Sequence, residues 1–208
     1  MSNAQFIPGA YILMDNPQKV YAGDLKYDKS TLTVKDKSGK KITYKTDEVY
    51  YAKTANNQRY ISTSGFEALS TFSSQVMGNT LVELVDSGRI CLMRYGYIVS
   101  GGSGGGTSHF MYLLKQEGMP NAVTVPGYVW TNQGKKFYEA ITPYAANRPD
   151  LQKLLADHRI NDRNLIAFFH AINSGQPFPA LELRGKEATP KKAVKEIKER
   201  PVEDPFGN

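Results

Sequence analysis

Apolar residues in the first 125 positions recur mostly at every second residue or in short runs, which is typical of β-strands. The pattern is clearest in segment 26–45, where apolar and polar residues alternate on either side of the turn Lys37-Ser38-Gly39-Lys40. Its apolar positions are Leu32, Val34, Ile42 and Tyr44, and its polar positions are mostly lysine and threonine. We therefore expect an antiparallel hairpin with one buried face and one solvated face.

The same signals predict further strands up to residue 125. They are expected at 10–14, 20–27, 31–37, 41–45, 49–53, 80–85, 89–99, 109–115 and 122–125. Strands 80–85 and 89–99 form a second hairpin, in which Gly88 is expected to supply the left-handed residue of the turn. Segment 66–77 fits either a helical face or a loop.

After Pro126 the apolar spacing changes to that of helices, which are expected at 134–145, 149–158 and 161–173. Pro143 should end the first helix and Pro149 suits the first turn of the second. Asn161 is the expected cap of the third helix and Gly175 its left-handed stop. The predicted fold class is α+β: an antiparallel β-sheet or roll, followed by three short C-terminal helices.

Four segments follow from this pattern. Residues 5–126 form a β-rich domain, 127–175 a helical segment packed on it, and 176–208 a charged, Pro-containing tail with few apolar positions, which we expect to be dispensable for folding. Residues 1–4 form the remaining segment, in which Ser2-Asn3-Ala4 resembles the remnant of a cleaved tag; this implies that a signal peptide was removed before residue 5. The alternative is that Met1 is a native cytosolic start.

Charge and cysteine content narrow the function classes. Segment 26–45 holds seven lysines and two aspartates, so most of the net charge of +6 lies there. Such a strip could contact nucleic acid, but we favour a solvated face and expect no specific nucleic-acid binding. The single Cys91 excludes an intramolecular disulfide and is expected to be a small buried hydrophobe. The chain lacks the run of about 18 apolar residues that a transmembrane helix needs.

Candidate chemistry lies beside the glycine-rich run 100–108. The amides of Gly102 and Gly104 could cradle an anion, with Thr107, His109 and Arg94 as further polar groups of a pocket. The run lacks the Gly-Lys-Ser/Thr ending of a phosphate loop, so the favoured interpretation is a flexible connection between two strands. His109, His158 and His170 have no metal-ligand spacing, and neither a metal nor a cofactor is expected.

Two sets of short motifs follow one another along the chain. The early set is Lys37-Ser38-Gly39-Lys40-Lys41, Thr46-Asp47-Glu48-Val49 and Arg59-Tyr60-Ile61; the late set is Tyr112-Leu113-Leu114-Lys115, Lys135-Lys136-Phe137-Tyr138-Glu139-Ala140, Arg148-Pro149-Asp150-Leu151 and Asn173-Ser174-Gly175. In this order they resemble a loose group of uncharacterised, signal-peptide-bearing proteins of Bacteroidetes-type bacteria, in which a β-sheet domain precedes a few helices. The resemblance covers most of residues 7–175 and implies an envelope or secreted location. The group has no established activity, so it implies no catalytic residues.

Two functions remain open from the sequence. The first is a periplasmic or secreted, non-catalytic module that binds a partner protein or a cell-envelope component, because the sequence shows no convergent set of acid, base, nucleophile or metal ligands. The alternative is an enzyme or small-ligand binder whose pocket lies beside residues 100–108. A deep pocket there, with a buried titratable group, would favour the alternative.

Overall fold

The computed structural model of the chain describes residues 5–69, 74–100, 106–127 and 133–180. The chain divides into two units, Met1–Phe178 and Pro179–Asn208. The helices and strands of the described residues all lie in the first unit.

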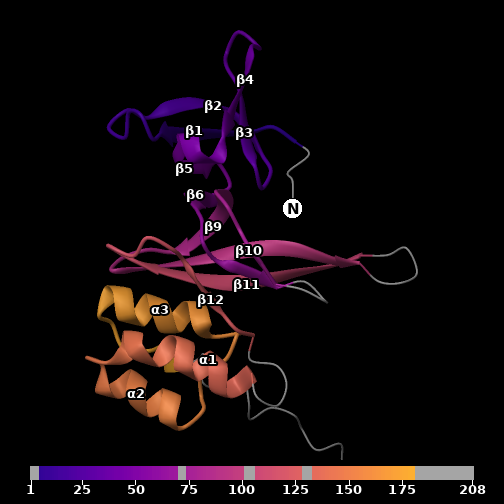
Figure 1. Ribbon diagram of the computed structural model, residues 1–208. Coiled ribbons are helices and arrows are strands. Elements are labelled where there is room, and N and C mark those ends of the chain that lie inside the picture. The colour runs from indigo at the N-terminus through magenta and orange to yellow at the C-terminus, as the bar shows by residue number, and fades with distance from the viewer. Residues whose placement is uncertain (1–4, 70–73, 101–105, 128–132, 181–208) are drawn as a thin grey trace, which may run out of the picture. The chain divides into compact units, whose positions relative to one another are not determined.

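An antiparallel sheet of ten strands dominates the fold, as expected, and its strand order is β12-β11-β10-β9-β6-β5-β1-β2-β3-β4 (Figure 1). The strands are β1 (Ile7–Leu13), β2 (Tyr21–Tyr27), β3 (Thr31–Lys35), β4 (Lys41–Lys45), β5 (Val49–Thr54), β6 (Arg59–Thr63), β9 (Thr80–Asp86), β10 (Ile90–Ser100), β11 (Gly106–Gln116) and β12 (Val123–Val125). A short 3-10 helix, η1 (Thr46–Glu48), precedes β5. The alternating pattern located nine of these ten strands to within a few residues, but it did not predict β6.

Three short helices follow the strands, also as expected. They are α1 (Gln133–Ile141), α2 (Pro149–Ala156) and α3 (Leu165–Ser174), with a 3-10 turn, η2 (Thr142–Ala145), after α1. Figure 1 shows them together beside the β9–β12 end of the sheet. Their buried side chains, including Phe137, Leu151 and Phe168, form one apolar cluster with Ile90 and Leu92 of β10. Because helices this short are marginal alone, they depend on packing against one another and against the sheet.

Alternation along the strands separates two further clusters. Tyr11, Leu25, Leu32, Val49 and Tyr60 belong to a core among β1–β6 and β9. Phe66, Val82, Met93, Tyr95 and Leu113 belong to a third cluster, on the face of β10 opposite the helices, because successive side chains of a strand point to opposite faces.

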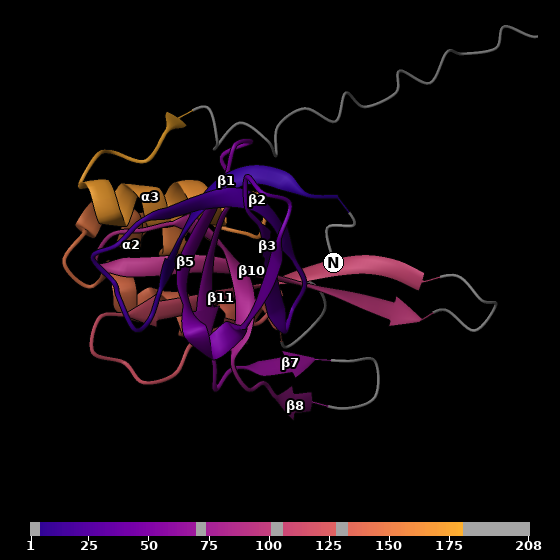
Figure 2. The ribbon, with the colours of Figure 1, turned by 90° about the horizontal axis from the view of Figure 1, so that it is seen from above.

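The far half of the β10–β11 hairpin pairs only with itself. The ladder between β10 and β11 runs from Ile90–Gln116 to Ser100–Gly106. β9 pairs with β10 only as far as Arg94, and β12 pairs with β11 only at residues 112–114. Figures 1 and 2 both show the end of this hairpin extending past its neighbouring strands. This leaves the side chains of residues 107–110 exposed.

Three local predictions were wrong. In segment 66–77, where a helical face or a loop was expected, Glu67–Leu69 (β7) and Ser74–Val76 (β8) pair as a small antiparallel sheet (Figure 2). The third helix begins at Leu165 with Asn164 at its N-cap, and Asn161 instead accepts a turn hydrogen bond from the Arg163 amide at 3.0 Å. The stop at Gly175 is correct, with φ of 72°.

Gly88 does not adopt the left-handed conformation predicted for it. A Cβ atom added at Gly88 would lie 2.7 Å from Cγ of Asn173 in α3. The turn between β9 and β10 therefore needs glycine because another side chain approaches its backbone closely, and not because of its φ angle.

Candidate functional site

A row of polar side chains crosses three neighbouring strands. Tyr60 of β6 lies opposite Glu83 of β9, and Glu83 lies opposite Arg94 of β10. Residues in register on neighbouring strands point to the same face of a sheet. The row therefore interrupts an otherwise apolar surface, where Leu81 belongs to one core cluster and Leu92 to another.

Arg94 and Glu83 form a close ion pair within this row. Nε and Nη2 of Arg94 donate to the same carboxylate oxygen, Oε2 of Glu83, at 3.0 and 2.7 Å. The two side chains are 36% and 24% exposed, so the pair is partly shielded from water. Within the described part of the chain, neither Nη1 of Arg94 nor Oε1 of Glu83 makes a hydrogen bond. One donor and one acceptor are therefore free to meet a ligand.

Two tyrosine hydroxyls lie next to the ion pair. The Tyr60 hydroxyl donates a hydrogen bond to the Tyr27 hydroxyl, and the two rings lie 4.0 Å apart between centroids. Burial, followed by the hydrogen bond with Tyr27, raises the pKa of Tyr60 well above its ordinary value of 10.0. Tyr60 thus stays neutral at physiological pH and acts as a hydrogen-bond donor.

The turn between β2 and β3 lies beside these groups and forms one wall of the site. Asp28 Oδ1 accepts hydrogen bonds from the amides of Ser30 and Thr31, both at 2.8 Å. The carbonyl of Lys29 accepts from the Leu81 amide at 3.2 Å, which attaches this turn to the start of β9. The Lys29 ammonium lies 4.6 Å from the centre of the Tyr95 ring.

These groups enclose a cavity of about 320 Å³, which we call the Arg94 pocket. It is lined by Tyr27, Asp28, Lys29, Gln58, Tyr60, Leu81, Glu83, Arg94, Tyr95, Gly96, Ser108, His109 and Phe110. The Phe110 side chain remains 53% exposed, and the Arg94 guanidinium carbon lies 5.5 Å from the centre of its ring. The site thus combines aromatic rings with a balanced set of charges, which is the usual make-up of a small-molecule site.

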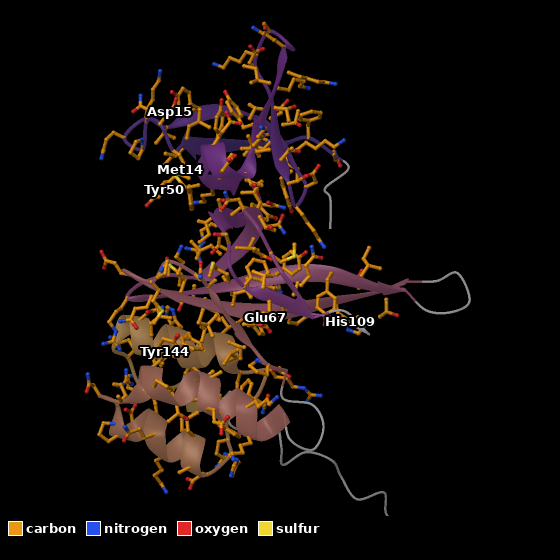
Figure 3. The ribbon with its side chains drawn as sticks, in the orientation of Figure 1. Met14, Asp15, Tyr50, Glu67, His109 and Tyr144 are labelled. Carbon is orange, nitrogen blue, oxygen red and sulfur yellow. The ribbon has the colours of Figure 1, made fainter. Side chains whose placement is uncertain are left out.

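The structure brings together two of the residues predicted from the sequence. Arg94 and His109 both line the Arg94 pocket, and Figure 3 marks His109 on the β10–β11 hairpin. His109 is exposed and stacks on Tyr97 at 5.7 Å between ring centroids. Thr107 is exposed on β11 and does not line the pocket. Gly102 and Gly104 lie outside the described residues.

Sequence reasoning missed Tyr27, Lys29, Tyr60 and Glu83. One signal was available, because Glu83 is the only charged residue in the apolar run Leu81–Val85. A charge inside a buried strand needs a partner, and Arg94 of the neighbouring strand supplies it. The approach of the β2–β3 turn to β9 joins strands that β6, β5 and β1 separate in the strand order, and local pattern does not show such a contact.

The other candidate side chains have structural roles. His158 lies edge-on to Tyr138, and His170 is exposed with Nδ1 3.5 Å from Asp86 Oδ1. Cys91 is half-buried against the third apolar cluster, and burial raises the pKa of its thiol, which disfavours the reactive thiolate. Among the described residues, no group of three His, Cys, Asp or Glu side chains could hold a metal ion.

The lysine-rich hairpin formed by β3 and β4 lies at the edge of the sheet opposite β12. Its last strand, β4, is the edge strand, with Lys41 and Lys45 exposed, while Lys35 pairs with Asp24 at 3.2 Å. Ile42 shares a face with buried Val34 but is 40% exposed because no strand covers this edge. Lysine on an edge strand discourages pairing with other chains.

No family model matches the chain, and comparisons with the curated proteins and with the solved structures found no match. In the described part of the chain, no helix is long and apolar enough to cross a membrane.

The Asp28 turn should make stability depend on acid pH. Burial acts to raise the pKa of Asp28, but hydrogen bonds from Ser30 and Thr31 outweigh it and lower the pKa below 3.8. The bonds therefore stabilise the fold at neutral pH, and this contribution is lost as pH falls below 3.8.

We expect Asp28→Asn to reduce the free energy of unfolding at pH 7 by about 1 kcal/mol, since a charged acceptor becomes a neutral one. Urea denaturation at pH 7 and pH 3 measures the effect, and the gap between the two chains should shrink at pH 3. Asp15→Asn, on an exposed turn (Figure 3), is the matched control. A gap of equal size at both pH values would contradict the role given to the Asp28 charge.

Proposed function

We propose that the protein is a non-catalytic binding module that holds a small polar ligand, or the polar group of an envelope component, in the Arg94 pocket. The observation that carries this proposal is the Arg94–Glu83 pair, which keeps one donor and one acceptor unused and lines a cavity of about 320 Å³ together with aromatic rings. Such a cavity lies at the lower end of the size range of small-molecule sites.

Binding suits this geometry better than catalysis. Arg94 and Glu83 form an ion pair at 2.7 Å, and the Tyr60 hydroxyl donates a hydrogen bond to the Tyr27 hydroxyl. A general acid or base must exchange a proton with substrate, whereas these groups are arranged as fixed hydrogen-bond partners. The His109 ring at the rim is stacked on Tyr97.

A periplasmic or secreted location is part of the proposal. It is supported by the resemblance to signal-peptide-bearing proteins, and it would bring the pocket into contact with envelope material. The position of the pocket beside Ser108 and His109 agrees with the small-ligand alternative raised by the sequence.

Two-dimensional ¹H–¹⁵N NMR of the full chain tests the proposal. The probes are benzoate, phenylethylamine, N-acetylglycine, adenosine and cellobiose, each added separately. At least one should shift the amides of residues 94–96 and 108–110, and Arg94→Gln should abolish those shifts. Arg89→Gln, on the exposed β9–β10 turn, is the matched control and should leave them unchanged. Shifts that survive Arg94→Gln, or no shifts with any probe, would overturn the proposal.

A further inference from the structure

We infer that the ligand of the Arg94 pocket is a neutral saccharide of one or two rings, an inference that rests on the proposed function. The charges of the pocket are balanced. Lys29 and Arg94 are matched by Asp28 and Glu83, and the strongest pairing, between Arg94 and Glu83, measures 2.7 Å. An anionic ligand would need surplus positive charge here, because a buried charge without a partner is costly.

A cationic ligand is disfavoured because cationic side chains of the protein already lie against aromatic rings of the pocket. Aromatic pockets bind ammonium groups by placing them over ring faces. Here Lys29 already lies 4.6 Å from the centre of the Tyr95 ring, and Arg94 lies 5.5 Å from that of Phe110. A second cation would be repelled by both.

The free atoms of the ion pair match a sugar. Nη1 of Arg94 is a donor and Oε1 of Glu83 is an acceptor, and they belong to two paired side chains. A hydroxyl group both donates and accepts, so two neighbouring hydroxyls of a pyranose can bind this donor and acceptor together. A ligand that only donates or only accepts would leave one of the two atoms unpaired, at a cost in affinity.

Phe110 supplies a surface for the apolar face of the sugar ring. Its side chain is 53% exposed at the rim, and the ring of Tyr112 supports it edge-on at 5.5 Å. The C–H face of a pyranose can lie against such a ring while its hydroxyls reach the ion pair. The size of the cavity, about 320 Å³, suits a ligand of one or two rings.

Titration calorimetry and ¹H–¹⁵N NMR of the full chain with cellobiose, maltose and N,N′-diacetylchitobiose test the inference. Glucose-6-phosphate, glucosamine and adenosine are the anionic, cationic and aromatic comparisons. At least one neutral disaccharide should bind at residues 94–96 and 108–110, and more tightly than the three comparison ligands. Glu83→Gln and Phe110→Ala should each weaken that binding about tenfold, since a lost contact of roughly 1.4 kcal/mol has that effect.

Tyr50→Phe, on an exposed ring outside the pocket (Figure 3), should leave affinity unchanged, and the NMR spectra show whether each variant is folded. Preferred binding of glucose-6-phosphate, glucosamine or adenosine at the same amides would overturn the saccharide inference and leave the proposed function standing. No binding of any probe at about 10 mM, a concentration that reveals millimolar Kd values, would overturn both.

Discussion

Phe137→Ala should lower the free energy of unfolding by about 3–5 kcal/mol, the largest effect that we expect from a single substitution in this chain. Phe137 of α1 is fully buried, in the cluster that joins the three helices to Ile90, Leu92 and Leu114 of the sheet. Its removal leaves a cavity between two layers, and the rigid sheet limits how far the helices can collapse into it.

Thermal melting of the full chain measures the loss, which should appear as a fall in Tm of about 10 °C for a chain of this size. Phe110→Ala is the matched control, because it removes the same ring from a position that is 53% exposed. Its Tm should fall by no more than about 2 °C. Equal shifts in the two variants would show that the helices do not depend on this core.

Much of the fold was readable from the sequence because the relevant signals are local. Alternation located β3 and β4, and helical spacing located α2, whose Pro149 stands at its first position. The start of α3 was placed wrongly because Asn161 and Asn164 are both good caps, and the intervening turn is decided by packing. β7 and β8 were missed because three-residue strands carry too little pattern.

The candidate site was less readable because its groups come from distant parts of the chain. Arg94 and His109 were found through their closeness to the glycine run, which also pointed to Thr107, an exposed side chain outside the pocket. Tyr27 and Tyr60 are 33 residues apart in the chain, and their hydroxyls meet although β5 and β1 lie between β6 and β2 in the strand order. Glu83 was also missed, although it left a signal in the sequence, since a charge within an apolar strand requires a partner.

A second large effect should follow from breaking the contact between Asn173 and the β9–β10 turn. The side-chain amide of Asn173 bonds to both backbone groups of Ile90, as a neighbouring strand would. Its Oδ1 accepts from the Ile90 amide at 3.1 Å, and its Nδ2 donates to the Ile90 carbonyl at 2.8 Å. Nδ2 also lies 3.3 Å from Oδ2 of Asp86. These bonds fasten α3 to the sheet at the turn that joins β9 to β10.

Asn173→Ala should lower the free energy of unfolding by about 2–4 kcal/mol, because two backbone groups of a buried residue lose their partner. Gly88→Ala changes the turn instead of the helix and should have a similar effect. Its new Cβ would lie 2.7 Å from Cγ of Asn173 and would displace the Asn173 side-chain amide from Ile90. Both values come from urea denaturation of the full chain at pH 7.

Gly78→Ala and Ser174→Ala are the matched controls. A Cβ at Gly78 meets no atom within 4 Å. The Ser174 hydroxyl bonds only to nearby residues, donating to the His170 carbonyl and accepting from the Gln176 amide. Each should change the free energy of unfolding by less than about 1 kcal/mol. If Gly88→Ala were as mild as Gly78→Ala while Asn173→Ala remained costly, the turn would have room to move, and the close approach of Asn173 would not be what requires glycine there.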